Sequence, residues 1–198
     1  MICGIDEAGR GPLAGPVCAA AVILPEQFDQ GILADSKKLS PARREEARLR
    51  ICAQAVWGIG WASHTEIDAI NILQASLLAM KRAFEQMLKH EAMAKFGEFN
   101  LGDVHSLPLD VIVDGLFVPD ICAPCRALVK ADDQIPQVMA ASILAKTARD
   151  REMERYAKLY PEYGYEKHKG YPTKEHRAAI MKHGPSPIQR LSFTVKAV

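Results

Sequence analysis

The chain has 198 residues, of which 48% are hydrophobic and 25% are charged, and its formal net charge is +1. This length and apolar content suffice for one sizeable core, so we expect a single domain over residues 1–198. No run of 18 or more apolar residues occurs, and the five cysteines have no disulfide-like spacing, which argues against membrane-spanning and disulfide-rich secreted proteins and favours the cytoplasm.

The chain begins with alternating strand-like and helix-like segments. Two apolar runs, 1–5 and 17–24, flank the segment DEAGRGPLAGP, which predicts a strand, a sharp connection and a second strand. Ser40-Pro41 supplies an N-cap and a first-turn proline for a charged helix that ends near residue 55. Residues 56–62 then predict a third strand.

A long helix is predicted from Ser63, which has capping-box spacing with Glu66 and precedes apolar residues at steps of three or four. The polar, irregular segment 91–108 is typical of a surface loop. Beyond it, LDVIVDG and ALVKADD are short strand-like runs, each leading directly into an acidic residue.

Two further helices are predicted in the last third of the chain. One begins at Pro136 and carries small residues that would let it lie close against a sheet, and the other runs from Thr173 to Gly184. Together the segments predict an α/β fold in which one layer of mixed sheet is flanked by helices.

Four acidic residues follow apolar strand-like runs: Asp6, Glu7, Asp114 and Asp132. Strand ends converge at a sheet edge, where clustered carboxylates repel and raise one another's pKa. Bound Mg²⁺ or Mn²⁺ offsets that repulsion, and two such ions can clamp a scissile phosphate. An ordinary turn is the simpler interpretation for Asp114 or Asp132 taken alone, whereas metal ligation better explains the adjacent pair Asp6-Glu7.

Glycine and basic residues supply candidate contacts to phosphate. Gly9-Arg10-Gly11 would allow backbone amides to approach a ligand closely, although a plain turn also explains the glycines. The segment matches neither the phosphate loop of nucleotide triphosphatases nor the dinucleotide fingerprint. Lys37-Lys38, and Lys146 with Arg149 on one helix face, are further cationic candidates, each more simply explained as surface charge.

The charge is distributed unevenly along the chain. Residues 146–198 hold 12 Lys and Arg against 6 Asp and Glu, a net of +6, which leaves residues 1–145 at −5. The basic end contains YGYEKHKGYPTKEH, where aromatic rings alternate with Lys and His. Such a pattern is typical of nucleic-acid surfaces, and tyrosines that merely cover the core explain it equally well.

Seven segments occur in the order found in ribonuclease HII, the bacterial form of type 2 ribonuclease H: DEAGRGPLAGP, DSKKLS, INILQA, VDG, KADD, ASILAKTARD and KGYPTKEH. They place almost the whole chain, residues 5–193, within this resemblance. Arg10 favours type HII over HIII, which usually carries GTG there. The chain departs from the family pattern at Ala131, where glycine is common, and at Leu116, where asparagine is common.

The resemblance implies a ribonuclease H-like fold, with a small helical C-terminal portion at about residues 165–198 that helps hold the substrate. It implies that the four acids named above are catalytic and bind two divalent ions, Mn²⁺ or Mg²⁺. Gly9-Arg10-Gly11 then reads the ribose 2′-hydroxyl, and Tyr171 stacks on the sugar of the following deoxynucleotide. Asp150 is a candidate for contacts just outside the metal ligands.

The implied activity is endonucleolytic hydrolysis of the RNA strand of RNA/DNA hybrids, with cuts on the 5′ side of ribonucleotides embedded in duplex DNA. It would leave 5′-phosphate and 3′-hydroxyl ends and remove misincorporated ribonucleotides and RNA primers. We expect a monomer with no membrane partner. Two alternatives stay open: a structure-specific DNA nuclease, which would also cut all-DNA duplexes, and a non-catalytic hybrid binder, whose binding would be salt-dependent and yield no product.

Overall fold

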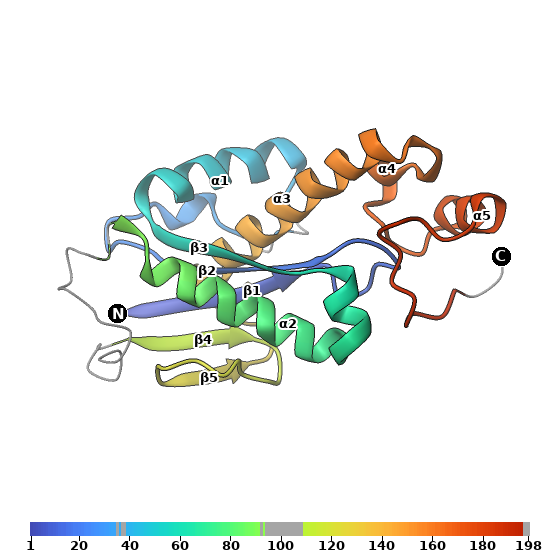
Figure 1. Ribbon diagram of the computed structural model, residues 1–198. Helices are drawn as coiled ribbons and strands as arrows, with labels where there is room; N and C mark the ends of the chain where they lie inside the picture. The colour runs from blue at the N-terminus through green and yellow to red at the C-terminus, as the bar shows by residue number, and fades with distance from the viewer. Residues whose placement is uncertain (35, 37–38, 92, 94–108, 196–198) are drawn as a thin grey trace.

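The computed structural model describes residues 1–198 except 35, 37–38, 92, 94–108 and 196–198. Its centre is a five-stranded sheet in the order β3-β2-β1-β4-β5 (Figure 1). Neighbouring strands are antiparallel from β3 to β1 and parallel from β1 to β5, so the sheet is mixed, as the sequence predicted. The strands are β1 (Ile2–Ala8), β2 (Val17–Ile23), β3 (Val56–Ala62), β4 (Asp110–Asp114) and β5 (Cys125–Leu128).

Strand β1 runs further than its apolar residues indicate. The sequence predicted that it ends at Ile5, but it continues to Ala8, which pairs with Cys18 of β2. Pairing with a fully buried neighbour extends the ladder through residues whose side chains are polar. Asp6 and Glu7 therefore lie inside the strand and not beyond its end.

Helices cover both faces of the sheet (Figure 1). The helix α2 (His64–Leu88) packs on β2 and β3 from one side. On the other side, α3 (Pro136–Leu159) packs on β1 and β2, and α1 (Pro41–Gln54) packs against α3. Because β2 is covered on both faces, all of its residues are buried and it lacks the alternation of a half-exposed strand.

The predicted start of α2 is confirmed, but the helix is broken. Ser63 accepts a hydrogen bond from Glu66 N–H, and the Glu66 carboxylate accepts one from Ser63 N–H. Asn71 has φ 68° and ψ 165°, and its Oδ1 accepts bonds from the N–H groups of Leu73 and Gln74. An asparagine in this conformation starts a second helix by capping it, which helical periodicity alone does not reveal.

The N-terminal end of α3 lies unusually close to β1. A Cβ at Gly4 would overlap the backbone of Gln137 and Val138, so only glycine permits this approach. Pro136 is the first residue of α3, in agreement with the predicted helix start. The close approach places the residues that precede α3 beside the C-terminal half of β1.

A smaller helical portion follows α3 and extends past the sheet edge at which β1 and β4 end (Figure 1). It contains η5 (Pro161–Tyr163), α4 (Tyr165–His168) and α5 (Lys174–His183), which Thr173 caps as predicted. The chain then returns to the sheet, where Gln189 forms an isolated bridge with Ala14.

Two further expectations concern the predicted surface loop and membrane-spanning helices. Nearly all of the predicted surface loop 91–108 lies outside the described residues. Among the helices that are described, none combines the length and the apolar character needed to cross a membrane.

Candidate active site

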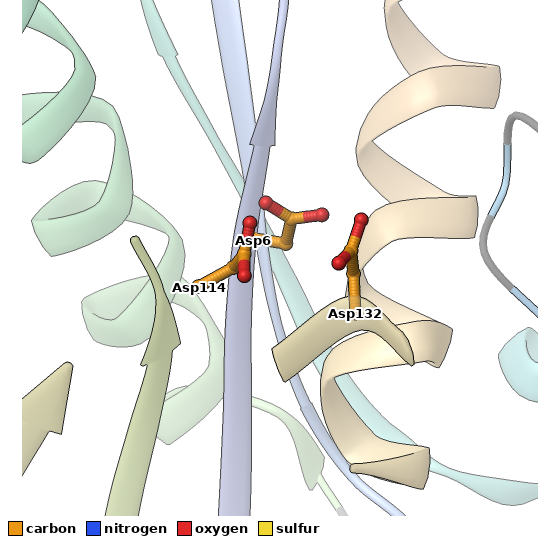
Figure 2. Close-up of side chains that lie close together, drawn as sticks. All are labelled: Asp6, Asp114 and Asp132. Atoms are coloured by element: carbon orange, nitrogen blue, oxygen red, sulfur yellow. The ribbon is translucent and has the colours of Figure 1, made fainter. Parts of the chain in front are cut away.

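Three aspartates from separate segments meet where β1 and β4 end (Figure 2). Asp6, Asp114 and Asp132 each offer a carboxylate oxygen, and these oxygens all lie within 4.8 Å of one another. Asp6 and Asp132 are buried, and Asp114 is partly buried. We call these three residues the carboxylate cluster.

Strand register and one hydrogen bond assemble the carboxylate cluster. β1 and β4 are parallel, with Ile5 paired to Val113, so the next residues along, Asp6 and Asp114, are neighbours. Asp114 Oδ1 accepts a 2.8 Å hydrogen bond from Ala131 N–H. This bond ties the 3₁₀ turn η4 (Ala131–Asp133) to the end of β4 and brings its Asp132 to the other two acids.

The expectation that Asp132 ends a strand is wrong. β5 ends at Leu128, and Lys130 has a left-handed backbone with φ 59°, which interrupts the extended chain before the acid. In the described part of the chain β5 is an edge strand whose one partner is β4, so no second neighbour prolongs it. Asp132 instead reaches the site from η4, the turn that leads into α3.

Glu7 is close to the cluster but is not one of the three converging acids. Its carboxylate lies outside the group of three, although its charge acts on Asp6 and that of Asp114 acts on it. Glu7 Oε1 lies 3.6 Å from Arg10 Nη1. Burial raises the pKa of Glu7, and the Arg10 charge opposes that shift. Its predicted role as a metal ligand stays a prediction.

The cluster is electrostatically unfavourable as the protein alone builds it. Burial raises the pKa of Asp6 well above its ordinary value, and the charges of Glu7 and Asp114 raise it further. A 2.7 Å hydrogen bond from Glu7 N–H opposes the shift without reversing it. Three converging carboxylates form the hard-oxygen donor set that suits Mg²⁺ or Mn²⁺, so a divalent ion fits these residues.

Residues 9–16, which join β1 to β2, form the second part of the site, and we call them the glycine-rich connection. Leu13 N–H donates to the Gly170 carbonyl at 2.8 Å, and Gly15 N–H donates to the Ile188 carbonyl at 2.9 Å. Backbone hydrogen bonds therefore join the connection to two segments of the C-terminal portion, at Gly170 and at Ile188. Its residues Arg10 and Gly11 are exposed.

Of the two basic residues predicted on α3, only Lys146 is positioned for solvent or substrate. Arg149 is 1% exposed, and its guanidinium donates to the carbonyls of Ala14, Pro16 and Lys169. This position does not support direct contact between Arg149 and a phosphate. The Lys146 side chain is 23% exposed, and its Nζ lies 5.9 Å from the Tyr171 ring centroid.

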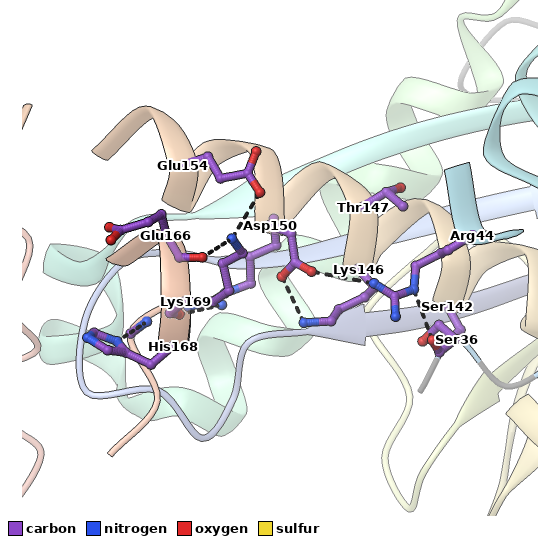
Figure 3. A network of polar contacts seen from close by, with 12 residues as sticks. Ser36, Arg44, Ser142, Lys146, Thr147, Asp150, Glu154, Glu166, His168 and Lys169 are labelled. Atoms are coloured by element: carbon purple, nitrogen blue, oxygen red, sulfur yellow. Dashed lines mark hydrogen bonds and ion pairs between the residues drawn. The ribbon is translucent and has the colours of Figure 1, made fainter. Parts of the chain in front are cut away.

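Asp150 belongs to a polar network on α3 (Figure 3). Its carboxylate lies 2.7 Å from Lys146 Nζ and 3.6 Å from Arg44 Nη1. Asp150 thereby links α1 to α3 and lies outside the group of three converging aspartates. Its predicted contact with the metal environment stays a prediction.

The predicted pair Lys37-Lys38 lies outside the described residues. The neighbouring Ser36 of the same motif is buried, and its Oγ accepts a 2.7 Å hydrogen bond from Ser142 Oγ of α3. The Ser36 carbonyl also accepts a bond from Arg44 Nε at 2.9 Å (Figure 3). These bonds anchor Ser36 to α1 and α3.

Tyr171 is 40% exposed beside the glycine-rich connection. A Cβ placed on Gly11 would lie 3.7 Å from Tyr171 Cε1, so the ring and the connection share one surface. His176 Nδ1 lies 3.0 Å from the Tyr171 carbonyl, within hydrogen-bonding distance. The role of this ring in stacking on a sugar stays a prediction.

Sequence reasoning missed the buried residues that support this surface. Arg190 is fully buried, and its side chain donates to the glycine-rich connection. His168 and His176 stack with ring centroids 4.5 Å apart beneath Tyr171. Arg190 follows the last predicted helix in a segment with no recognised pattern, and both histidines lie in the segment considered for nucleic-acid contact. The sequence therefore offered no signal that they are buried.

Comparisons with known proteins agree with this geometry. Residues 3–196 match the model of the family described as ribonuclease HII. The ribonuclease HII of Treponema denticola is 61% identical over 201 residues, covering 99% of each chain. The solved ribonuclease H2 of Pyrococcus horikoshii superposes with a TM-score of 0.68 at 26% identity, covering 98% of this chain and 94% of that one.

A second solved neighbour is the ribonuclease HII of Archaeoglobus fulgidus, whose structure was determined in complex with PCNA. It has a TM-score of 0.66 at 28% identity and covers 96% of this chain and 92% of that one. These likenesses confirm the predicted ribonuclease H-like fold. The chain thus belongs to the ribonuclease HII family of metal-dependent endoribonucleases that act on RNA/DNA hybrids.

Proposed function

We propose that this enzyme cuts on the 5′ side of ribonucleotides embedded in duplex DNA, as well as within longer RNA/DNA hybrids, and leaves 5′-phosphate and 3′-hydroxyl ends. The observation that carries the proposal is the convergence of Asp6, Asp114 and Asp132 within 4.8 Å at an edge of the sheet. The natural role of such cutting is removal of misincorporated ribonucleotides and RNA primers by a monomeric enzyme.

The residues proposed to hold two divalent ions are the carboxylate cluster and Glu7. When bound, such ions supply a nucleophilic water and stabilise charge on the scissile phosphate. The protein contributes the hard oxygen donors and fixes their positions through β1, β4 and η4. Clustered acids, whose burial and mutual repulsion raise the pKa of Asp6, support this assignment, because a protein that only bound hybrids would have little use for them.

Selection of the ribonucleotide is assigned to the surface beside the acids. The ribose 2′-hydroxyl distinguishes RNA from DNA chemically. Gly9-Arg10-Gly11 is proposed to contact it, with Tyr171 stacked on the next sugar and Lys146 near the phosphates. The proximity of Arg10 to Glu7 and of Gly11 to Tyr171 supports this arrangement, since both contacts join the connection to other proposed site residues. Lys37 and Lys38 are proposed as further phosphate contacts.

One substitution on β4, with a matched control on the same strand, tests the metal assignment. Asp114→Asn keeps the shape but removes a proposed ligand charge. It should lower cleavage by about 1,000-fold, the loss expected when a main electrostatic stabiliser of a transition state is removed. Asp110→Asn alters the exposed acid at the other end of β4, which pairs with Arg126 at 3.2 Å, and should cleave like the parent.

The assay uses a labelled duplex with one embedded ribonucleotide, beside an RNA/DNA hybrid and an all-DNA duplex, with Mn²⁺ or Mg²⁺ and an EDTA control. Metal-dependent cutting only at the 5′ side of the ribonucleotide supports the proposal. Cutting of the all-DNA duplex would favour a structure-specific DNA nuclease. Binding without any product would favour a hybrid-binding protein, and near-normal turnover of Asp114→Asn would remove Asp114 from the mechanism.

A further inference from the structure

Arg190 is completely buried, and its guanidinium donates hydrogen bonds to one short segment of the chain. It makes five hydrogen bonds of 2.6–3.2 Å, and every acceptor is a backbone carbonyl of the glycine-rich connection: Gly9, Arg10, Pro12, Gly15 and Pro16. Among the described residues, none of its bonds goes to a carboxylate. A buried charge is costly, and here backbone dipoles of one connection compensate it.

Hydrogen bonds to two separate segments hold the backbone around Arg190 in place. Arg190 N–H donates to the Leu13 carbonyl at 2.9 Å. The next two N–H groups, of Leu191 and Ser192, each donate to the Asp68 carboxylate at 2.9 Å. Asp68 lies in the first segment of α2, before its break. The guanidinium is therefore held at a defined place relative to both the connection and the sheet.

The direction of these carbonyls determines where the neighbouring amides point. No cis peptide bond occurs among the described residues, and a trans peptide directs its C=O and its N–H to opposite sides. Because the carbonyls of Gly9 and Arg10 turn inward to Arg190, the N–H groups of Arg10 and Gly11 turn outward. Within the described part of the chain, neither N–H donates to a protein acceptor, and both residues are exposed.

We propose that Arg190 is a positioning residue that gathers the carbonyls of the connection and so presents the Arg10 and Gly11 amides as two preformed donors for a substrate oxygen, that of the ribose 2′-hydroxyl. This inference rests on the proposed function and assigns part of its specificity to a residue that does not touch substrate. Two proposed site residues neighbour these amides: Glu7 lies 3.6 Å from the Arg10 side chain, and a Cβ added at Gly11 would lie 3.7 Å from the Tyr171 ring.

Filling the space beside the connection would not require a charge at this position. Burial, together with the nearby Arg149, lowers the pKa of Arg190 to about 9, so the burial of the cation opposes folding. An apolar side chain of similar length would fill the space without that cost. An apolar side chain has no donors and so cannot orient the five carbonyls toward one point. The outward direction of the Arg10 and Gly11 amides depends on that orientation.

Three variants separate positioning from stability. Arg190→Met removes the donors, and Arg190→Lys keeps the charge but offers fewer directions for hydrogen bonds. Ile51→Ala, a fully buried α1 residue remote from the connection, is the control for general destabilisation. All are assayed below their melting temperatures, by single-turnover cleavage at saturating enzyme and by competition with an unlabelled all-DNA duplex.

Arg190→Met should lower the cleavage rate at the embedded ribonucleotide by about 100-fold, as expected when a reacting group is misplaced by roughly 1 Å. Competition by the all-DNA duplex should change little, and Arg190→Lys should recover part of the rate. If folded Arg190→Met cleaves like Ile51→Ala, the proposal is wrong. If the Met variant does not fold, the Lys variant decides: a rate and selectivity equal to those of the parent would overturn the proposal.

An independent measurement reports on the connection itself. In amide NMR spectra, Arg190→Met should shift the resonances of Gly9, Gly11 and Gly15 but leave those of Gly58 and Gly60 in β3 unchanged. Unchanged resonances in the connection would overturn the proposal. Parent enzyme that fails to select ribonucleotides would instead contradict the proposed function, and the NMR result would still show whether Arg190 shapes the connection.

Discussion

The carboxylate cluster and the glycine-rich connection are neighbours, but the protein holds them in opposite ways. In the cluster, burial and like charges raise the pKa of Asp6, so the folded protein holds together groups that repel. In the connection, Arg190 and Arg149 supply donors to backbone carbonyls that would otherwise be buried without partners. The cluster therefore suits an added cation, whereas the carbonyls of the connection find their donors within the chain.

This difference assigns the two regions distinct contributions to stability. Without a bound ion, repulsion among the acids lowers the free energy of unfolding, and binding of an ion to the folded protein raises it again. A preformed loop stabilises the fold continuously and has no conformational entropy left to lose when substrate binds. Substitutions in the connection should consequently damage stability, and neutralising the cluster should improve it.

The largest effect is expected in the connection, at Gly9. Its φ is +102°, and a Cβ there would overlap the Arg149 guanidinium, so Gly9→Ala adds both backbone strain and a clash. We expect it to lower the free energy of unfolding by about 2–4 kcal/mol, measured by urea denaturation. Gly115→Ala is the matched control, because φ is +118° but nothing lies within 4 Å of the added Cβ. Equal losses in both variants would mean that Arg149 does not pack tightly on the connection.

A pH-dependent effect is expected beneath Tyr171. Burial lowers the pKa of His176 to about 4, so between pH 6.5 and 4 the unfolded chain binds a proton that the folded chain does not. Stability contributed by neutral His176 is present above pH 6.5 and is lost as the pH falls toward 4. Lowering the pH from 7.5 to 4.5 should cost the parent about 2 kcal/mol more than His176→Asn, whose amide can still donate to the Tyr171 carbonyl.

Urea denaturation at the two pH values measures this difference. The stacked His168, whose pKa burial also lowers, stays in both proteins, as do the acidic residues, so subtracting the two losses isolates His176. Identical losses in the parent and the variant would contradict a buried, neutral His176.

The smallest expected effect is a gain of stability in the cluster. Asp6→Asn removes one of the repelling charges but keeps an oxygen able to accept the 2.7 Å bond from Glu7 N–H. At pH 8 and without metal, the free energy of unfolding of the variant should be about 1 kcal/mol higher than that of the parent. Asp120→Asn, which neutralises an exposed acid paired with Lys81, should give no gain.

With metal bound, we expect the parent to be more stable than Asp6→Asn. Saturating Mn²⁺ should stabilise the parent against thermal unfolding and leave Asp6→Asn nearly unchanged, because only the parent keeps the full proposed ligand set. A metal-free Asp6→Asn protein that is less stable than the parent would show that repulsion is not the dominant feature of the cluster.

Local patterns in the sequence determined most of the secondary structure. Ser40-Pro41, Ser63 and Thr173 mark helix starts that the structure confirms, because a cap and its first turn depend on residues a few positions apart. The apolar runs likewise predicted β2 and β3 closely. The same patterns together with the ordered motifs were enough to predict the family, and they singled out the three aspartates that the structure brings together.

Only the tertiary structure decided which acids converge and what supports the surface beside them. Asp132 joins the cluster from a 3₁₀ turn tied to Asp114, and Glu7, although adjacent to Asp6 in the chain, is not among the three converging acids. Arg149 is more simply explained from the sequence as a surface charge, and no pattern marks Arg190. Both are buried against carbonyls of the connection, which for Arg190 lie 174 to 181 positions away in the chain. Hydrogen bonds between such distant segments depend on the packed fold, and periodicity and spacing along the chain carry no record of them.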